Sequence, residues 1–247
     1  MRIIFAVISF MLLSVSAFQP SVVAEEDPIG VYYRGLVEPS EVIEVASQVP
    51  GIIEKVFVER GDRVKKGQVL VTLKAGVEKA QVDLAEAKLE FGRRKVLRNE
   101  KLREKQLISI HEKDEMETEV RLMEIQLQEA RERLNMRTIS SPVTGIVVER
   151  YLGPGEYVGE GSIMKIACVN PLNVEVVVPA TVYGTINRGM KAEVLPQNPP
   201  GGSYQGRVVI VDEVIDAASG TFGVRVQLPN PNYRLPAGIS CQVRFFK

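Results

Sequence analysis

Two 25-residue stretches of the sequence align with each other without a gap, and this internal repeat limits what the chain can fold into. The stretches are residues 49–73 and 143–167, so the offset is 94 positions (145 minus 51). Because glycine is the residue that turns with positive φ require, matched glycines predict the same turns made twice. The matched glycines are Gly51, Gly61 and Gly67 in the first copy and Gly145, Gly155 and Gly161 in the second.

Both copies have the periodicity of β-strands. β-Branched residues alternate with other residues in "IIEKVFV" of the first copy and in "GIVVERYL" of the second. Each copy should therefore form a small sheet with one apolar face, and two such sheets would bury these faces against each other. We expect a β-sandwich built from two halves, residues 41–75 and residues 137–169.

The residues between the two halves have the periodicity of a helical hairpin. Residues 76–136 contain no proline, and their apolar residues recur at steps of three and four, as in the seam of a coiled coil. We predict two helices of about thirty and twenty-five residues that fold back on each other. The apolar positions are Met116, Val120, Met123, Leu127, Ala130 and Leu134 in the second helix, and two stripes in the first, Ala80, Leu84, Ala87 and Phe91 beside Val82, Ala85, Leu89 and Val96.

The turn of this hairpin is predicted near "KQLISIHE". Ser109 and Glu112 have the S-x-x-E spacing of a capping box, which places the start of the second helix there. A hairpin end has little core in which apolar side chains can be buried, so a cluster of them indicates a partner-binding tip. The apolar residues around the turn are Leu102, Leu107, Ile108 and Ile110.

Residues 170–247 contain short strand-like segments separated by Pro-Gly and Asn-Pro turns, which is typical of a small β-barrel. The upstream segment "VYYRGLVEP" should add a strand, so residues 31–40 are assigned to the same barrel. "PATVYGTINRGM" interrupts the strands and predicts a short helix that ends before Gly189. The expected fold class is mixed β, a split sandwich plus a small barrel, with an inserted α-helical coiled-coil hairpin.

Composition excludes several classes of function. The 31 basic and 31 acidic residues give a formal net charge of zero, so nothing marks a nucleic-acid-binding protein. The single histidine, His111, belongs to no cluster with metal-ligand spacing, and no catalytic constellation is visible. We therefore expect no enzymatic activity, no metal site and no cofactor.

Residues 1–24 have the features of a secretory signal peptide. Met1 and Arg2 precede an apolar run that is too short to cross a bilayer comfortably, and small residues suited to cleavage follow. An uncleaved N-terminal anchor is the alternative. Export would place Cys168 and Cys241 in an oxidising compartment, where they are either a disulfide or two buried free thiols, and the sequence leaves this open.

The two half-motifs, G-x-[IV] followed by G-[DE]-x-V-x-x-G, resemble the halves of a biotinyl/lipoyl domain. In carrier proteins of that type a tight hairpin bearing the modified lysine joins the halves, whereas about seventy residues separate Leu73 from Val143 here. Lys79 superficially resembles the carrier lysine but lies where a helix is predicted to begin. A carrier-like protein and a free-standing periplasmic binding protein remain as alternatives.

A split lipoyl-like domain with a helical hairpin between its halves resembles the periplasmic adaptors, or membrane fusion proteins, of HlyD and RND-type efflux systems. Arg98, Leu102 and Ser109 match the R-x-x-x-L-x-x-x-x-x-x-S motif by which such adaptors engage a TolC-type outer-membrane channel. The resemblance implies a homo-oligomer in the periplasm, peripheral to the inner membrane. Its other partner would be an inner-membrane transporter, an RND pump in preference to an ABC permease. We expect the membrane-proximal domain of longer adaptors to be missing.

Overall fold

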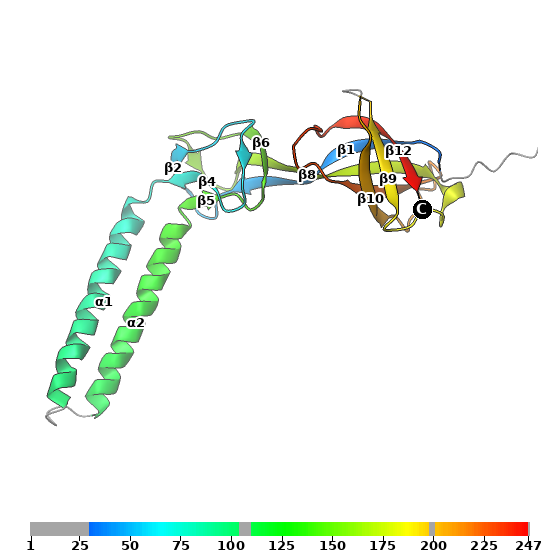
Figure 1. Ribbon diagram of the computed structural model, residues 1–247. Helices are drawn as coiled ribbons and strands as arrows, with labels where there is room; N and C mark the ends of the chain where they lie inside the picture. The colour runs from blue at the N-terminus through cyan, green and yellow to red at the C-terminus, as the bar shows by residue number, and fades with distance from the viewer. Residues whose placement is uncertain (1–29, 104–109, 198–200, 247) are drawn as a thin grey trace, which may run out of the picture.

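The computed structural model describes residues 30–103, 110–197 and 201–246. The chain forms a helical hairpin, a β-sandwich and a β-barrel in a row, with the hairpin projecting from the sandwich (Figure 1). Two long strands, β1 (Tyr33–Ala46) and β8 (Ser162–Pro179), lead from the sandwich into the barrel. The predicted fold class is confirmed.

The sandwich has two layers, and the 94-residue repeat relates the strand order of one layer to that of the other. Within the described residues one layer is β1-β8-β6-β3 and the other is β5-β4-β2-β7. β6 and β7 begin 94 residues after β2 and β3 (145 minus 51 and 157 minus 63), so the sequence alignment corresponds to equivalent strands. The strands are β2 (Gly51–Val56), β3 (Arg63–Val64), β4 (Val69–Leu73), β5 (Thr138–Ser140), β6 (Gly145–Arg150) and β7 (Tyr157–Val158).

One pair of matched glycines makes the same turn twice, as predicted. Gly61 and Gly155 both have positive φ, 95° and 87°. The N–H of Gly61 donates to the carbonyl oxygen of Val147 at 2.8 Å, and the N–H of Gly155 donates to that of Ile53 at 2.9 Å. These two hydrogen bonds are related by the 94-residue offset, because Ile53 is the counterpart of Val147.

For the other matched glycines the turn prediction is wrong. Gly67 has a φ of 81°, but its counterpart Gly161 does not have positive φ. Gly51 and Gly145 lie at the starts of strands and are needed for space. A Cβ on Gly51 would lie 2.7 Å from Nη1 of Arg137, and a Cβ on Gly145 would lie 2.4 Å from a neighbouring carbonyl oxygen.

The hairpin consists of α1 (Gly76–Arg103, 28 residues) and α2 (Ile110–Asn135, 26 residues), close to the predicted lengths. Val82 and Leu89 of α1 pack against Leu127 and Ala130 of α2, and all four are buried. The spacing of three and four residues brings these side chains to one face of each helix, so burying them holds the two helices together. The predicted coiled-coil seam is confirmed in α2 and in one of the two stripes of α1.

The barrel closes through β1 and β8. In the part of the chain that the structure describes, six strands follow the order β1-β12-β9-β10-β11-β8, and β8 pairs with β1. Along β11 the buried residues Phe222, Val224, Val226 and Leu228 alternate with more exposed ones, which is the period of a strand with one face in a core. The further barrel strands are β9 (Lys191–Pro196), β10 (Tyr204–Val211), β11 (Thr221–Leu228) and β12 (Ile239–Phe246).

β1 and β8 run without a break from one β part to the other. Their antiparallel pairing extends from Gly35 and Val176 in the barrel to Ala46 and Ser162 in the sandwich, with register shifts beside Ser40 and between Val45 and Ala46. A single pair of strands therefore contributes to both hydrophobic cores, and the sandwich and the barrel are joined by a hydrogen-bonded ribbon instead of a loose linker.

In the barrel region, one sequence-based expectation is wrong and one open alternative is decided. The short helix predicted in "PATVYGTINRGM" is reduced to one 3₁₀ turn, Ala180–Val182, followed by turns with positive φ at Gly184 and Gly189. Cys168 and Cys241 are buried free thiols, so no disulfide links them.

The predicted signal peptide, residues 1–24, lies outside the described residues. Among the helices that are described, none combines the length and apolar character needed to span a bilayer.

Candidate functional site

Of the three residues predicted to bind a partner, two belong to the described part of the hairpin. Arg98 and Leu102 lie in the last two turns of α1, which ends at Arg103, and Arg98 is exposed. Positions 98 and 102 are about one turn apart along the backbone of α1. Ser109 lies outside the described residues, and α2 begins directly after it, at Ile110.

A stripe of exposed apolar residues runs along α1, and we call it the outer stripe. It consists of Val77, Ala80, Leu84, Ala87 and Phe91. Val77, Leu84 and Phe91 are 68%, 56% and 58% exposed. Leu84 is two residues from the buried Val82, which is about 200° around the helix, so the outer stripe lies outside the seam. Leu84 also borders a surface hollow between the two helices, which Ala130 of α2 lines from the other side.

The outer face of α2 carries a smaller apolar patch. Leu122 and Ile125 are 55% and 56% exposed, and Ile125 is two residues from the buried Leu127 of the seam. The hairpin thus presents apolar side chains on two outer faces that point in opposite directions. The sequence predicted two apolar stripes on α1, but periodicity could not tell which of them faces α2.

Ion pairs cross between the two helices along the exposed sides of the seam. Because these side chains are largely solvated, each pair contributes at most about 1 kcal/mol to stability. The pairs are Arg93 with Glu124 at 2.7 Å, Lys95 with Glu119 at 3.1 Å, and Arg131 with Glu86 at 2.6 Å.

Arg137 attaches the hairpin to the sandwich. It follows α2, and its guanidinium bonds to Glu78 in the first turn of α1 at 2.6 Å and to the carbonyl oxygen of Pro50 at 2.9 Å. Its own carbonyl oxygen accepts a hydrogen bond from the N–H of Leu73, the last residue of β4, at 2.8 Å. The absence of a side chain at Gly51 leaves room for the guanidinium. One residue therefore joins both ends of the hairpin to the sandwich.

The ion pair of Arg137 and Glu78 is mostly buried, with side chains 22% and 14% exposed. A main-chain hydrogen bond is the largest cause that lowers the pKa of the Glu78 carboxyl below its usual value of 4.5, and the hydrogen bond and charge of Arg137 lower it further, against the opposing effect of burial. Glu78 is therefore held in the charged form that Arg137 requires. Sequence reasoning missed this pair because the two residues are 59 positions apart.

Neither Lys79 nor the two thiols have the surroundings of a reactive group. Lys79 lies in the first turn of α1, where its N–H donates to the carbonyl oxygen of Ala75 at 3.0 Å, so it does not stand at the tip of a β-hairpin. Burial raises the pKa of the Cys241 thiol to about 11, and burial followed by the charge of Glu41 raises that of Cys168. Both thiols are protonated at neutral pH and are weak nucleophiles.

Comparison with known proteins agrees with this arrangement. Residues 41–167 match the family model of the CzcB-like barrel-sandwich hybrid domain, and residues 172–247 match that of the CusB-like β-barrel domain. The solvent efflux pump periplasmic linker SrpA of Pseudomonas putida is 26% identical over 214 residues, which cover 80% of this chain and 56% of that protein. Multidrug resistance protein MexA of Pseudomonas aeruginosa is 25% identical over 214 residues, with the same two coverages of 80% and 56%.

A solved structure has the same fold. The crystal structure of a MacA-MexA chimeric protein, containing the Pseudomonas aeruginosa MexA α-hairpin domain, superposes with a TM-score of 0.74 at 20% identity, over 88% of this chain and 78% of that one. The chain spans little more than half the length of the curated relatives that it matches. A barrel-sandwich hybrid with an inserted hairpin, followed by the β-barrel, places the chain in the periplasmic adaptor, or membrane fusion protein, family of efflux systems.

Proposed function

We propose that this chain is the adaptor subunit that links an inner-membrane transporter, an RND-type pump, to a TolC-type outer-membrane channel. Family membership and relatives that are periplasmic linkers of efflux pumps support this proposal. In it the chain is exported by residues 1–24, acts in the periplasm without enzymatic activity, and has the domain limits predicted from the sequence.

The observation that carries the proposal is the hairpin. α1 has 28 residues, which at 1.5 Å per residue extends about 40 Å, and its free end points away from both β parts (Figure 1). Positions 98 and 102 fall in the last two turns before that end, where the helices of a channel could continue the coiled coil. The carrier alternative is not supported, because Lys79 lies in a helix.

We further propose that the adaptor works as a homo-oligomer in which hairpins pack side by side. The outer stripe of α1 has the three-and-four spacing of a coiled-coil seam but is exposed, and Leu122 and Ile125 lie on the opposite outer face of the hairpin. A contact between α1 of one copy and α2 of the next is head to tail, and such contacts close into a ring when the rotation between copies permits.

Substitution of Leu102 tests the docking role of the tip. Leu102→Asp would place a charge in the apolar contact with the channel, at a cost of about 2 kcal/mol or more once the charge is desolvated. The position lies far from the cores of the sandwich and the barrel, so we expect loss of efflux-dependent resistance at normal protein abundance. Ser109→Ala should cost about 1 kcal/mol locally through the lost cap.

Gln128→Asp is the matched control, because Gln128 is an exposed residue of α2 away from the tip. It should leave resistance and abundance unchanged. Full transport by Leu102→Asp at normal abundance would mean that the tip is not the docking surface.

A further inference from the structure

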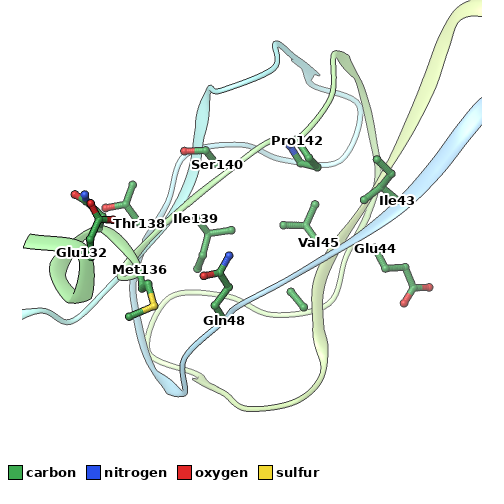
Figure 2. Close-up of a pocket in the computed structure, with 12 residues that line it drawn as sticks. Ile43, Glu44, Val45, Gln48, Glu132, Met136, Thr138, Ile139, Ser140 and Pro142 are labelled. Carbon is green, nitrogen blue, oxygen red and sulfur yellow. The ribbon is translucent and has the colours of Figure 1, made fainter. Parts of the chain in front are cut away.

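A groove of about 430 Å³ opens between the end strands of the two sandwich layers. β1 and the turn after it form one wall, β5 forms the other, and the last turn of α2 closes one end (Figure 2). The side chains of Val45, Gln48 and Ile139 converge on it from the two walls.

Both walls are sheet edges. Over Glu41 to Ala46, β1 pairs with β8 on one side and with no other described strand, because its pairing with β12 ends at Val37. β5 pairs with β4 on one side, and no strand among the described residues pairs with its other side. An unpaired edge presents a row of N–H and C=O groups, which is the template for adding an extended segment.

The side chains specify what kind of segment fits. Val45 and Ile139 are buried members of the sandwich core, so apolar side chains pointing inward from an added strand would extend that core. Glu44 and Glu132 stand on the rim, and both are exposed. One carboxylate oxygen of Glu44 accepts a hydrogen bond from the hydroxyl of Ser162 at 2.8 Å, and neither glutamate has an ion pair within the described residues. Lys165 lies opposite Glu44 in the pairing of β1 with β8, and among the described residues that line the groove none is basic.

We propose that this groove binds an extended segment of a partner protein in which apolar side chains alternate with lysine or arginine. Side chains alternate between the two faces of a strand, so such a segment places its apolar residues on the core and its cations beside Glu44 and Glu132. The groove lies on the sandwich, away from the hairpin tip, so binding in the groove does not depend on docking of the tip to a channel.

A titration with two synthetic peptides tests the proposal. One heptapeptide alternates valine with lysine, and the other alternates valine with glutamate. Added to the full mature chain labelled with ¹⁵N, the lysine peptide should shift the amide resonances of residues 41–46 and 138–140 and slow their hydrogen exchange. The glutamate peptide should do neither. If the lysine peptide leaves these amides unchanged, the proposal is overturned.

Charge variants make the test specific. Glu44→Gln combined with Glu132→Gln should weaken binding of the lysine peptide about tenfold. Glu44→Lys combined with Glu132→Lys should transfer the preference to the glutamate peptide. Glu54→Gln, at an exposed carboxylate of β2 that does not line the groove, is the control and should bind like the unaltered chain. Binding that is indifferent to the paired substitutions would overturn the proposal.

A second copy of this chain is the other possible occupant of the groove. Hydrogen exchange of the edge amides distinguishes it from a partner protein. The amides of residues 41–46 would then be protected without peptide, to an extent that rises with protein concentration. That result would overturn the assignment to a partner protein.

Discussion

Arg137 shows how one side chain can set the attachment of a whole hairpin. Its guanidinium reaches the first turn of α1 and the turn before β2, while its main chain bonds to the end of β4. Charge-assisted hydrogen bonds in a mostly buried site are stronger than the solvated pairs along the helices. A Cβ at position 51 would lie 2.7 Å from Nη1 of this side chain, so a larger residue there would require the guanidinium to shift.

We predict that Arg137→Ala lowers the free energy of unfolding by about 2 kcal/mol, because Glu78 and the Pro50 carbonyl lose a charged partner. Arg133→Ala removes an exposed ion pair with Glu129 and is the matched control, with an expected loss below about 0.5 kcal/mol. Chemical denaturation measures both. Equal losses for the two variants would contradict the role of Arg137.

The same pair predicts a dependence on pH. The pKa of Glu78 is lowered in the folded chain, so its contribution to stability is present above its usual value of 4.5 and is lost as the pH falls through the lowered value. Thermal unfolding measured between about pH 6 and pH 3 should show a smaller fall in Tm for Glu78→Gln than for the unaltered chain. If Tm falls equally with pH in the two proteins, Glu78 does not contribute to the pH dependence of stability.

At the scale of the element, the hairpin has apolar side chains that the seam between α1 and α2 does not bury. Val82 and Leu89 face α2, while Leu84 and Phe91 repeat the same spacing on the opposite face and remain exposed. Helical residues spaced by three and four that stay in solvent are the pattern of a helix with a second partner. This is the observation that leads from a single hairpin to an assembly of hairpins.

We predict that Leu84→Asp combined with Phe91→Asp abolishes self-association while the hairpin stays helical, because both side chains are more than half exposed in the single chain. Sedimentation velocity reports the size of the assembly and circular dichroism reports the helix content. Gln81→Asp, at an exposed position between the outer stripe and the seam, is the control. An assembly of unchanged size in the double variant would refute the packing of hairpins through this stripe.

At the scale of the whole molecule, the three parts differ in how they are joined. β1 and β8 connect the sandwich to the barrel as a continuous ribbon, and the guanidinium of Arg63 in β3 lies 4.4 Å from the ring centroid of Tyr233 in a barrel loop. The hairpin instead leaves one end of the sandwich, and among the residues that the structure describes neither β core contains a buried residue from α1 or α2. The β parts should therefore fold without the hairpin.

We predict that replacing Gly76 to Met136 with a short turn leaves a folded β protein. The two cut ends are close, since the N–H of Leu73 bonds to the carbonyl oxygen of Arg137 at 2.8 Å, so a short connection can close the gap. Thermal or denaturant unfolding should show one cooperative transition. Its absence would mean that the hairpin is required for the sandwich to form.

Some of this architecture follows from local patterns in the sequence. The repeat at offset 94 predicted the equivalence of β2 with β6 and of β3 with β7, because equal β-branched spacing in two segments produces equal strands. Of the matched glycines, Gly61 and Gly155 make the same turn. Helical periodicity without proline predicted α1 and α2. The assignment of Arg98, Leu102 and Ser109 to a partner-binding tip remains a prediction from the sequence.

Other features are decided only by tertiary structure. Two apolar stripes on α1 have the same periodicity. Contact with α2 decides that the stripe with Val82 and Leu89 is the buried one. The pairing of β1 with β8 through both cores and the bond of Arg137 to Glu78 each join residues far apart in sequence. That Cys168 and Cys241 are buried free thiols is likewise decided by the packing. Periodicity reports which side chains share a face, whereas the partner of that face is set by the packing of the whole chain.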